Sequence, residues 1–307
     1  MQSLPQFDIL GFGVVAVDDL LYVKEYPPAE SKVRVEHRLR QCGGLTGTAL
    51  VAAARLGARC AYVGMLGDDD LSREAIVCFE REGIDISHRA RNAHARPAHS
   101  TIIVDETRRT RTVFASLGGA AGAAPDWPAA ELIRSTRVLL VDHHGVEGTL
   151  RAVGIARECG VQVVADFERH PGGEFDKLLG WVDHLVLSQK FAEILTGESE
   201  PPRAVQALWN DRREAVVVTC GGKGCCSLGK GYDKPFIQPA FPVDVVDTTG
   251  CGDVFHGAYA AALAWNRPLA DRVKFASAAA ALKAQVRGGQ AGCPSRSEVE
   301  TFLSGRS

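Results

Sequence analysis

The most informative segment of the chain reads Val245-Val246-Asp247-Thr248-Thr249-Gly250-Cys251-Gly252-Asp253-Val254-Phe255-His256-Gly257. An apolar run leads into a turn with two glycines, and an alanine-rich stretch to Ala264 follows. This order predicts a strand, a turn and a helix that begins near Cys251 or Gly252. The first amides of a helix have no acceptor within it, and the helix dipole adds partial positive charge there. The turn therefore predicts an anion hole that suits a phosphoryl group.

Asp253 lies on the first turn of this expected helix. An unperturbed aspartate titrates near ~3.9 and is ionised at neutral pH, so it can accept the proton of an attacking hydroxyl as a general base. Phosphoryl transfer depends mainly on positioning and on charge stabilisation, and this turn offers both. The alternative is an acidic residue that only stabilises the dipole of its own helix.

Residues 247–255 resemble the C-terminal signature of the ribokinase-like (PfkB) family, which is normally Asp-Thr-x-Gly-Ala-Gly-Asp-x-Phe. Cys251 stands where the family has alanine, and both side chains are small. The resemblance implies an ATP-dependent carbohydrate kinase, with Asp253 as catalytic base and an anion hole at Gly250, Cys251 and Gly252.

An N-terminal segment, Gly43-Gly44-Leu45-Thr46-Gly47-Thr48-Ala49, resembles the family's Gly-Gly-x-x-x-Asn-x-Ala helix entry. Adjacent glycines let the backbone approach a sugar closely. Asp18, after the apolar run 13–17, matches an aspartate that binds sugar hydroxyls in the family; a merely solvated loop carboxylate is the alternative. The sugar site that the resemblance implies contains Asp18, Gly43, Gly44 and Thr48.

The segment Val216–Gly224 looks like the family's strand and glycine-rich turn beside ATP. The ATP-binding residues that the resemblance implies are Ser188, Thr219, Gly221 and Gly224. The family's Asn-x-x-Glu, which helps to organise Mg²⁺, falls on Ser188-Gln189-Lys190-Phe191. We therefore expect Mg²⁺ to rest mainly on the phosphates, with Asp247 or Asp166 as further candidates.

The segment Ala284–Gln290 resembles a loop that holds a monovalent cation in several relatives. The K⁺ site that this implies is formed by Asp247, Thr249, Ala284, Arg287 and Gly289. The alternative is a plain helix end on Gly288-Gly289.

Strand-like and helix-like runs alternate along the chain. Strands are expected at Phe7–Val15, Ala61–Met65, Val138–Asp142, Val161–Asp166, His184–Ser188 and Ala215–Thr219, and helices at Thr48–Leu56, Ser72–Glu82, Thr149–Glu158 and Arg203–Asn210. Apolar strands with intervening helices predict a parallel sheet covered on both faces. The resemblance spans about residues 7–305 and implies one α/β domain over residues 1–307, a ribokinase-like three-layer α/β/α sandwich with a mostly parallel central sheet.

Two segments alternate apolar and polar residues with a period of two, which is typical of strands with one wet face. Lys32–Arg40 carries Val33, Val35 and Leu39 on one side, and His99–Ser116 reads as two strands around a charged turn. We expect a small antiparallel β lid from about residues 20–41 and 98–117. Its uncovered apolar side chains predict a homodimer joined through the lid sheets.

Composition narrows the class of protein. A net charge of −2 over 307 residues argues against nucleic acid as a partner, and no apolar run is long enough to cross a membrane. The segment Met1–Asp8 lacks the pattern of a signal peptide, and the nine cysteines form no Cys-x-x-Cys pair. We expect a cytoplasmic protein with free thiols.

The sequence bears on four other functions. Gly11-Phe12-Gly13-Val14-Val15-Ala16 fits a dinucleotide-binding fingerprint, but the fingerprint needs a helix there, and Pro27-Pro28 follow instead. No Gly-x-x-x-x-Gly-Lys-Ser/Thr occurs, which excludes a Walker-type kinase. A nucleoside kinase of the same fold and a catalytically silent sugar-sensing protein stay open.

At residues 243–250 and 255–258 the chain resembles the sulfofructose kinase-like and ketohexokinase-like members of the family. These members give an expectation for the sugar substrate. In the sulfosugar enzymes a Lys, an Asn and an Arg clasp the sulfonate, and these positions fall on Lys32, Ala115 and His144. Only the lysine is kept, so a sulfonate is disfavoured. We expect Asp18 to bind a small ketose-like sugar, phosphorylated on a primary hydroxyl, with Lys32 and His144 at its far end.

Overall fold

The computed structural model describes residues 5–306, so the first four residues, on which part of the signal-peptide expectation rests, lie outside it. Within this range no helix combines the length and the apolar character that a membrane crossing requires. All nine cysteines are free thiols, and only Cys159 is exposed.

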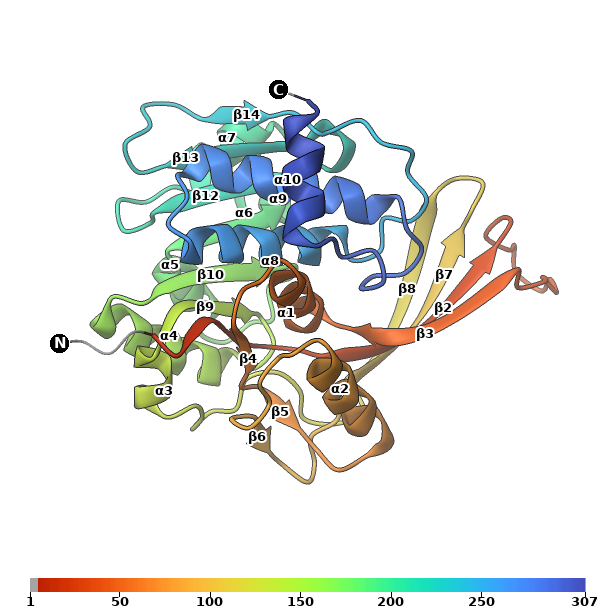
Figure 1. Cartoon of the computed structure of the whole chain (residues 1–307), viewed down its shortest axis with the longest axis horizontal. Helices are drawn as coiled ribbons and strands as arrows, with labels where there is room; N and C mark the ends of the chain where they lie inside the picture. The colour runs from red at the N-terminus through yellow and green to blue at the C-terminus, as the bar shows by residue number, and fades with distance from the viewer. Residues whose placement is uncertain (1–4, 307) are drawn as a thin grey trace.

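Eight strands form the main sheet in the order β14-β13-β12-β11-β10-β9-β1-β4 (Figure 1). Neighbours from β4 to β12 pair in parallel, and β13 and β14 extend the sheet antiparallel. The strands are β1 (Phe7–Phe12), β4 (Cys60–Tyr62), β9 (Thr136–Asp142), β10 (Gln162–Phe167), β11 (His184–Ser188), β12 (Ala215–Thr219), β13 (Cys225–Gly229) and β14 (Phe236–Gln238). The mostly parallel sheet predicted from the apolar runs is confirmed.

Helices cover both faces of this sheet. One core joins it to α1, α2, α8, α9 and α10, and a second core joins its other face to α3 through α7. The helices are α1 (Leu45–Arg55), α2 (Asp70–Arg81), α3 (Ala130–Arg134), α4 (Val146–Cys159), α5 (Phe175–Trp181), α6 (Gln189–Thr196), α7 (Pro201–Leu208), α8 (Cys251–Ala264), α9 (Leu269–Ala284) and α10 (Arg296–Ser304), with a 3₁₀ turn at Gly221–Lys223. The expected three layers are therefore present.

Glycines end three of the helices. Gly57, Gly83 and Gly160 follow α1, α2 and α4 with φ of 96°, 70° and 72°. These left-handed conformations are strained for residues with a β-carbon, so glycine ends a helix there at little cost.

A second sheet of four strands forms the lid, which stands away from the main body (Figure 1). Its strands are β2 (Ala16–Val23), β3 (His37–Gly43), β7 (Ala98–Asp105) and β8 (Thr110–Ser116), in the order β3-β2-β7-β8. The outer pairs are antiparallel and β2 pairs with β7 in parallel. A third, short sheet joins β5 (Met65–Leu66) to β6 (Ala90–Arg91). The lid has a small core of its own at Leu20, Tyr22, Ile102 and Val104.

One expectation about the lid is wrong in detail. The strand expected at Lys32–Arg40 begins only at His37, because β2 ends at Val23 and offers no partner beyond the Tyr22–His37 pair. Val33 and Val35 therefore lie in a loop.

The strand expected at Phe7–Val15 ends at Phe12, and the chain then enters the lid as β2. Asp18 consequently lies within a lid strand and not at the end of the first strand. No helix begins after Gly13 until α1, which removes the dinucleotide-binding alternative.

Candidate active site

The first turn of α8 is the centre of the site. Gly250 precedes the helix with φ of 75°, and a β-carbon there would lie 3.0 Å from the Gly289 α-carbon. The Cys251 amide donates to the Thr248 carbonyl oxygen at 3.2 Å, so it belongs to the turn. Within residues 5–306 the amides of Gly252 and Asp253 have no hydrogen-bond acceptor. The Cys251 amide therefore does not contribute to the expected anion hole, whereas the amides of Gly252 and Asp253 are free to bind an anion.

A cavity of about 430 Å³ lies between the lid and the carboxyl edge of the main sheet. The lid contributes Asp18, Ser100, Arg111, Val113 and Ala115, and the body contributes Gly44, His143, His144, Glu168, Arg169, Gly252 and Asp253. We call this the lid cavity. It is rich in hydrogen-bonding and charged groups, which suits a small polyhydroxylated ligand.

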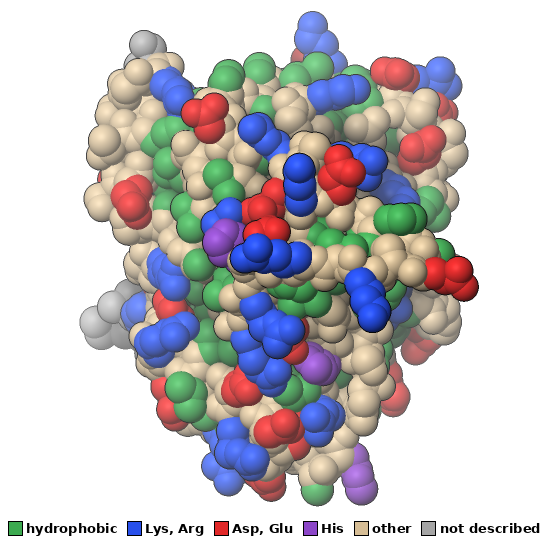
Figure 2. Space-filling model, turned by 90° about the vertical axis from the view of Figure 1, so that its right-hand side faces the viewer, with side chains coloured by type: hydrophobic (Ala, Val, Ile, Leu, Met, Phe, Trp, Pro, Cys, Tyr) green, Lys and Arg blue, Asp and Glu red, His purple; other side chains and the backbone are tan. Residues whose placement is uncertain are grey.

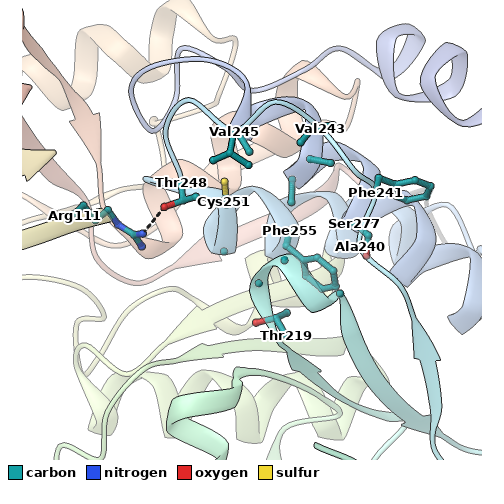
Figure 3. Close-up of a pocket in the computed structure, with 17 residues that line it drawn as sticks. Arg111, Thr219, Ala240, Phe241, Val243, Val245, Thr248, Cys251, Phe255 and Ser277 are labelled. Atoms are coloured by element: carbon teal, nitrogen blue, oxygen red, sulfur yellow. Dashed lines mark hydrogen bonds between the residues drawn. The ribbon is translucent and has the colours of Figure 1, made fainter. Parts of the chain in front are cut away.

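A second cavity of about 410 Å³ lies on the other side of the α8 terminus, and we call it the cleft (Figure 3). Its walls are mainly apolar and contain Phe241, Val243, Val245, Phe255 and Ala280, together with the glycine-rich turn at 221–224. Gly224 has φ of 94°, and a β-carbon there would lie 2.0 Å from the Gln238 carbonyl oxygen. The turn thus depends on glycine, and the cleft suits a flat apolar ring with an anionic end.

The two cavities meet at the start of α8. Gly252 and Arg111 line both of them. The Arg111 guanidinium reaches across from the lid strand β8 and donates from Nη1 to Thr248 Oγ1 at 3.0 Å (Figure 3). A guanidinium and free helix amides at one junction make a strong site for phosphate oxygens.

Asp253 faces the lid cavity from this junction and is partly exposed there. Burial raises the pKa of the Asp253 carboxyl well above its ordinary value, and the charges of Asp166 and Glu168 raise it further, while Arg111 opposes them. A carboxyl with a raised pKa is a stronger base once it is deprotonated, which favours removal of a hydroxyl proton.

Asp18 is the buried carboxyl on the lid side of the cavity. A β-carbon on Gly43 would lie 1.9 Å from Asp18 Oδ2, so only glycine fits opposite it. Burial raises the pKa of Asp18 to about 6. A hydrogen bond from Ser100 and the charge of His99 act in the opposite direction and lower this pKa. The absent side chain at Gly43 and the positive φ of Gly44 (85°) are therefore structural requirements of this wall.

A buried carboxylate fixes the far wall of the lid cavity. Asp142 Oδ2 accepts from the Val14 amide at 2.7 Å and from Thr46 Oγ1 at 2.8 Å, and Oδ1 accepts from the His144 amide at 2.8 Å. His143 Nε2 accepts from Arg169 Nε at 3.0 Å. Burial lowers the pKa of His143 to about 3, so this ring is neutral at physiological pH.

His256, on the second turn of α8, connects the first turn of that helix to strand β11 of the main sheet. Its Nδ1 lies 2.8 Å from the Gly252 carbonyl oxygen, and its Nε2 lies 3.0 Å from the Val186 carbonyl oxygen. Nδ1 also lies 3.2 Å from Asp166 Oδ2, yet that oxygen has no hydrogen-bond donor within residues 5–306. We attribute the missing donor at Asp166 Oδ2 to the His256 Nδ1 proton, which points at the Gly252 carbonyl oxygen instead.

Comparison with known proteins decides the family. The family described as pfkB family carbohydrate kinase matches residues 9–296. The chain belongs to the pfkB family of carbohydrate kinases. Like the family, it is an ATP-dependent phosphotransferase that acts on a sugar hydroxyl.

Relatives agree over most of their length. The ribokinase of Haemophilus influenzae is 31% identical over 271 residues, which cover 85% of this chain and 87% of that protein. Fructokinase-1 of Oryza sativa subsp. japonica is 28% identical over 327 residues, covering 95% and 96%. A crystal structure of an Agrobacterium tumefaciens protein provisionally named a ribokinase superposes with a TM-score of 0.91 at 29% identity, covering 98% of both chains. The ribokinase-like fold is thereby confirmed.

In this pfkB kinase most of the expected site residues lie together, but several do not. Lys32 is exposed in the loop before β3 and lies outside both cavities, so its expected place on the lid strand is wrong. Thr48 is buried and accepts from Gln290 Nε2 at 3.4 Å, and Ser188 caps α6 by accepting from the Phe191 amide at 3.3 Å. Neither lines the lid cavity or the cleft. Thr219, Gly221 and Gly224 do line the cleft.

Three charged residues of the lid cavity were not expected: Arg111, Glu168 and Arg169. Arg111 could have been noticed, because it alternates with Val113 and Ala115 on one face of a predicted strand. The other two follow strand β10, at an edge where ligands gather in α/β folds, but nothing in their spacing marks them.

Gly252→Ala tests the junction. A β-carbon at Gly252 would meet no atom within 4 Å, so the fold should tolerate it, and helix propensity adds about 0.5–1 kcal/mol of stability. The methyl group would nevertheless occupy space where a phosphoryl group must pass, and we expect kcat to fall about 10²- to 10³-fold. Thermal unfolding and steady-state kinetics measure the two effects. Gly180→Ala in α5, which also meets open space, is the matched control. An unchanged kcat in Gly252→Ala would contradict the assignment.

The raised pKa of Asp253 predicts the acid side of the pH profile. The base works only when deprotonated, so kcat/KM should fall as pH drops through a value well above the ~3.9 of a free aspartate. Glu168→Gln removes a neighbouring negative charge and should move this fall to lower pH, and Arg111→Gln should move it to higher pH. Shifts in the opposite directions would argue against Asp253 as the titrating group.

Proposed function

We propose that this kinase transfers the γ-phosphate of ATP to a primary hydroxyl of a small ketose-like sugar, with Asp253 as general base. The observation that carries the proposal is the meeting of the lid cavity and the cleft at Gly252 and Arg111. Two substrates in adjoining cavities would bring donor and acceptor together at one helix terminus, which is the main requirement of phosphoryl transfer.

ATP would lie in the cleft. Phe241, Val243 and Val245 offer apolar contact to the base, and the 221–224 turn offers backbone groups beside it. The phosphates would then extend to the free amides of Gly252 and Asp253, with Arg111 neutralising charge that builds up on the transferred group.

Mg²⁺ would accompany the nucleotide. Within residues 5–306 no group of three or more His, Cys, Asp or Glu side chains could hold a metal alone. Mg²⁺ usually takes one or two carboxylates and completes its shell with phosphates and water. The buried Asp166 Oδ2, which lacks a donor, is an oxygen of the required type. Bound there, the ion would neutralise phosphate charge.

The acceptor would lie in the lid cavity between Asp18 and His144. Asp18 would accept hydrogen bonds from sugar hydroxyls and so fix the ring with one hydroxyl directed at Asp253. Lys32 has no part in this proposal. Relatives named ribokinase and fructokinase make ribose and fructose the first acceptors to test.

The test is a panel of sugars and one nucleoside, with ADP release as the readout for wild type and Asp253→Asn. The substitution keeps the size of the side chain and removes its basicity, so kcat should fall about 10²- to 10⁴-fold on every acceptor. Release with a sugar supports the proposal, and release with the nucleoside alone supports a nucleoside kinase. No release with any acceptor would contradict the proposed ketose-like acceptor. Near wild-type turnover of Asp253→Asn would show that another group is the base.

We also propose a homodimer joined through the lid sheets. Leu39, which the sequence placed on the uncovered face of the lid, packs against the lid core instead. We therefore propose the exposed strand β8 as the surface that joins the two lids. Phe114 is 54% exposed on β8 and lines neither cavity. Figure 2, viewed from the lid side, shows hydrophobic side chains among many Lys and Arg side chains. An edge strand with an exposed aromatic residue is a candidate for pairing with a second copy.

Light scattering tests the dimer. Wild type should have twice the mass of one chain, and Phe114→Glu should shift it towards a monomer because a carboxylate would be buried in the contact. Val77→Glu, at a 62% exposed valine on α2, is the control and should stay dimeric. A monomeric wild type would contradict the proposal, as would equal masses for all three proteins.

A further inference from the structure

Two buried cysteines, one from the lid and one from the body, lie together. Cys42 is near the end of lid strand β3, and Cys78 lies on α2, which packs beside the base of that strand (Figure 1). Cys42 Sγ donates to the Glu74 carbonyl oxygen at 3.5 Å. Glu74 lies one helical turn before Cys78, and side chains on a helix lean towards its N-terminus, so the Cys78 thiol covers the same turn. The two thiols are within hydrogen-bond reach of each other.

The surroundings of Cys78 distinguish it from the other buried cysteines. The hydrogen bond from the Cys42 thiol lowers the pKa of Cys78. The charges of Arg81 and Arg55 lower this pKa further, whereas burial acts in the opposite direction. Burial raises the pKa of Cys60, a core thiol, above its ordinary value. A thiolate is the form that reacts with oxidants, and a second thiol beside it can complete a disulfide.

We propose that Cys42 and Cys78 form an oxidation site, at which hydrogen peroxide joins the lid to the body by a disulfide and weakens acceptor binding. The Cys78 thiolate attacks one peroxide oxygen, the O–O bond breaks, and the displaced hydroxide takes up the proton that Cys78 released and leaves as water. The Cys42 sulfur then attacks the Cys78 sulfenic acid. The S–O bond breaks, and the hydroxyl group leaves as a second water with the Cys42 proton. The two thiols lose two electrons, which reduce the peroxide.

Only a small oxidant fits this site. Cys42 is 7% exposed and Cys78 is 5% exposed, so a bulky disulfide such as oxidised glutathione cannot align with either sulfur. Hydrogen peroxide is little larger than water. Cys159 offers the opposite case, because its thiol is exposed at the end of α4 and accepts from Arg134 Nε at 3.2 Å. It is open to both oxidants.

A bond between the two sulfurs would act on the wall of the lid cavity. A disulfide holds its sulfurs about 2.05 Å apart, closer than two thiols in a hydrogen bond, so β3 must move relative to α2. Cys42 directly precedes Gly43, where a β-carbon would lie 1.9 Å from Asp18 Oδ2, and Gly44 lines the cavity. This wall is closely packed, so a shift of β3 changes the position of Gly43 against Asp18.

Oxidation would also remove a hydrogen bond on the body side. In its thiol form Cys78 Sγ donates to Gln290 Oε1 at 3.3 Å. Gln290 Nε2 in turn donates at 3.4 Å to Thr48 Oγ1, in the first part of α1. A disulfide sulfur has no proton to donate, so Gln290 Oε1, which is buried, loses this donor. Both changes displace groups next to the acceptor, and neither touches the cleft.

The site itself is tested on the whole chain, without any acceptor. After treatment with hydrogen peroxide and alkylation of the remaining thiols, mass spectrometry should find Cys42 and Cys78 in one joined peptide pair, and dithiothreitol should separate it. Oxidised glutathione should modify Cys159 and leave the pair reduced. Recovery of Cys42 and Cys78 as alkylated thiols after peroxide would overturn the proposal, and so would a sulfinic acid at Cys78 without the bond.

The activity arm rests on the proposed acceptor. Oxidation should raise the acceptor KM and lower kcat/KM about 10-fold or more, as for other small displacements of substrate-positioning groups, while the KM for ATP stays the same. Cys42→Ser and Cys78→Ser should keep the activity of reduced wild type and lose the response to peroxide. Cys159→Ser is the matched control and should respond as wild type does.

A response to peroxide that persists in both Cys42→Ser and Cys78→Ser would overturn the proposal and direct attention to Cys251 in the cleft. An unchanged acceptor KM in the joined protein would overturn the effect on acceptor binding. If no acceptor is phosphorylated before oxidation, the proposed function fails, whereas the mass measurement still decides the oxidation site. That measurement also decides if a serine variant does not fold, because it needs only wild type.

Discussion

Close packing of α8 against α1 is the constraint on which the site depends. A β-carbon on Gly257 would lie 2.1 Å from the Ala49 carbonyl oxygen, so the two helices touch through a position that only glycine can occupy. The next turns of α8 present buried alanines, among them Ala260 and Ala261. A helix held this closely cannot slide, because interiors are packed as densely as crystals. Its N-terminus is therefore fixed where the lid cavity and the cleft meet.

The acidic and the basic groups around that helix terminus have different effects. Burial raises the pKa of the base Asp253, and Asp166 and Glu168 lie close enough to raise it further, which costs stability but strengthens its affinity for a proton. Arg111 and Lys283 supply the positive charge, together with the dipole of α8. Arg111 lies on the side from which substrates enter, whereas Lys283 is buried behind the turn.

The lid and the body each hold half of the site. Asp18 and Arg111 belong to lid strands, whereas Asp253 belongs to α8 in the body. The lid cavity exists only because the lid stands over the carboxyl edge of the main sheet (Figure 1). Tyr22 and Glu106 connect the lid to the loop after α9, so its position is coupled to the turn at Asp247. Substrate contacts and the anion hole are thus parts of one connected structure.

The sequence alone determined the layered α/β fold, the start of α8 and the identity of Asp253, because these follow from local patterns: apolar runs, glycine stops and a helix-initiating turn. It could not determine what depends on contacts between distant segments. Lys32 was misplaced because strand formation at 32–36 needs a partner that β2 does not provide. Arg111 and Lys283 lie 142 and 30 positions from Asp253 in opposite directions, and only folding brings them to one helix terminus. The expected K⁺ site stays a prediction: the Ala284 carbonyl and the Asp247 carboxylate accept hydrogen bonds, whereas the buried Thr249 Oγ1 has no partner within residues 5–306.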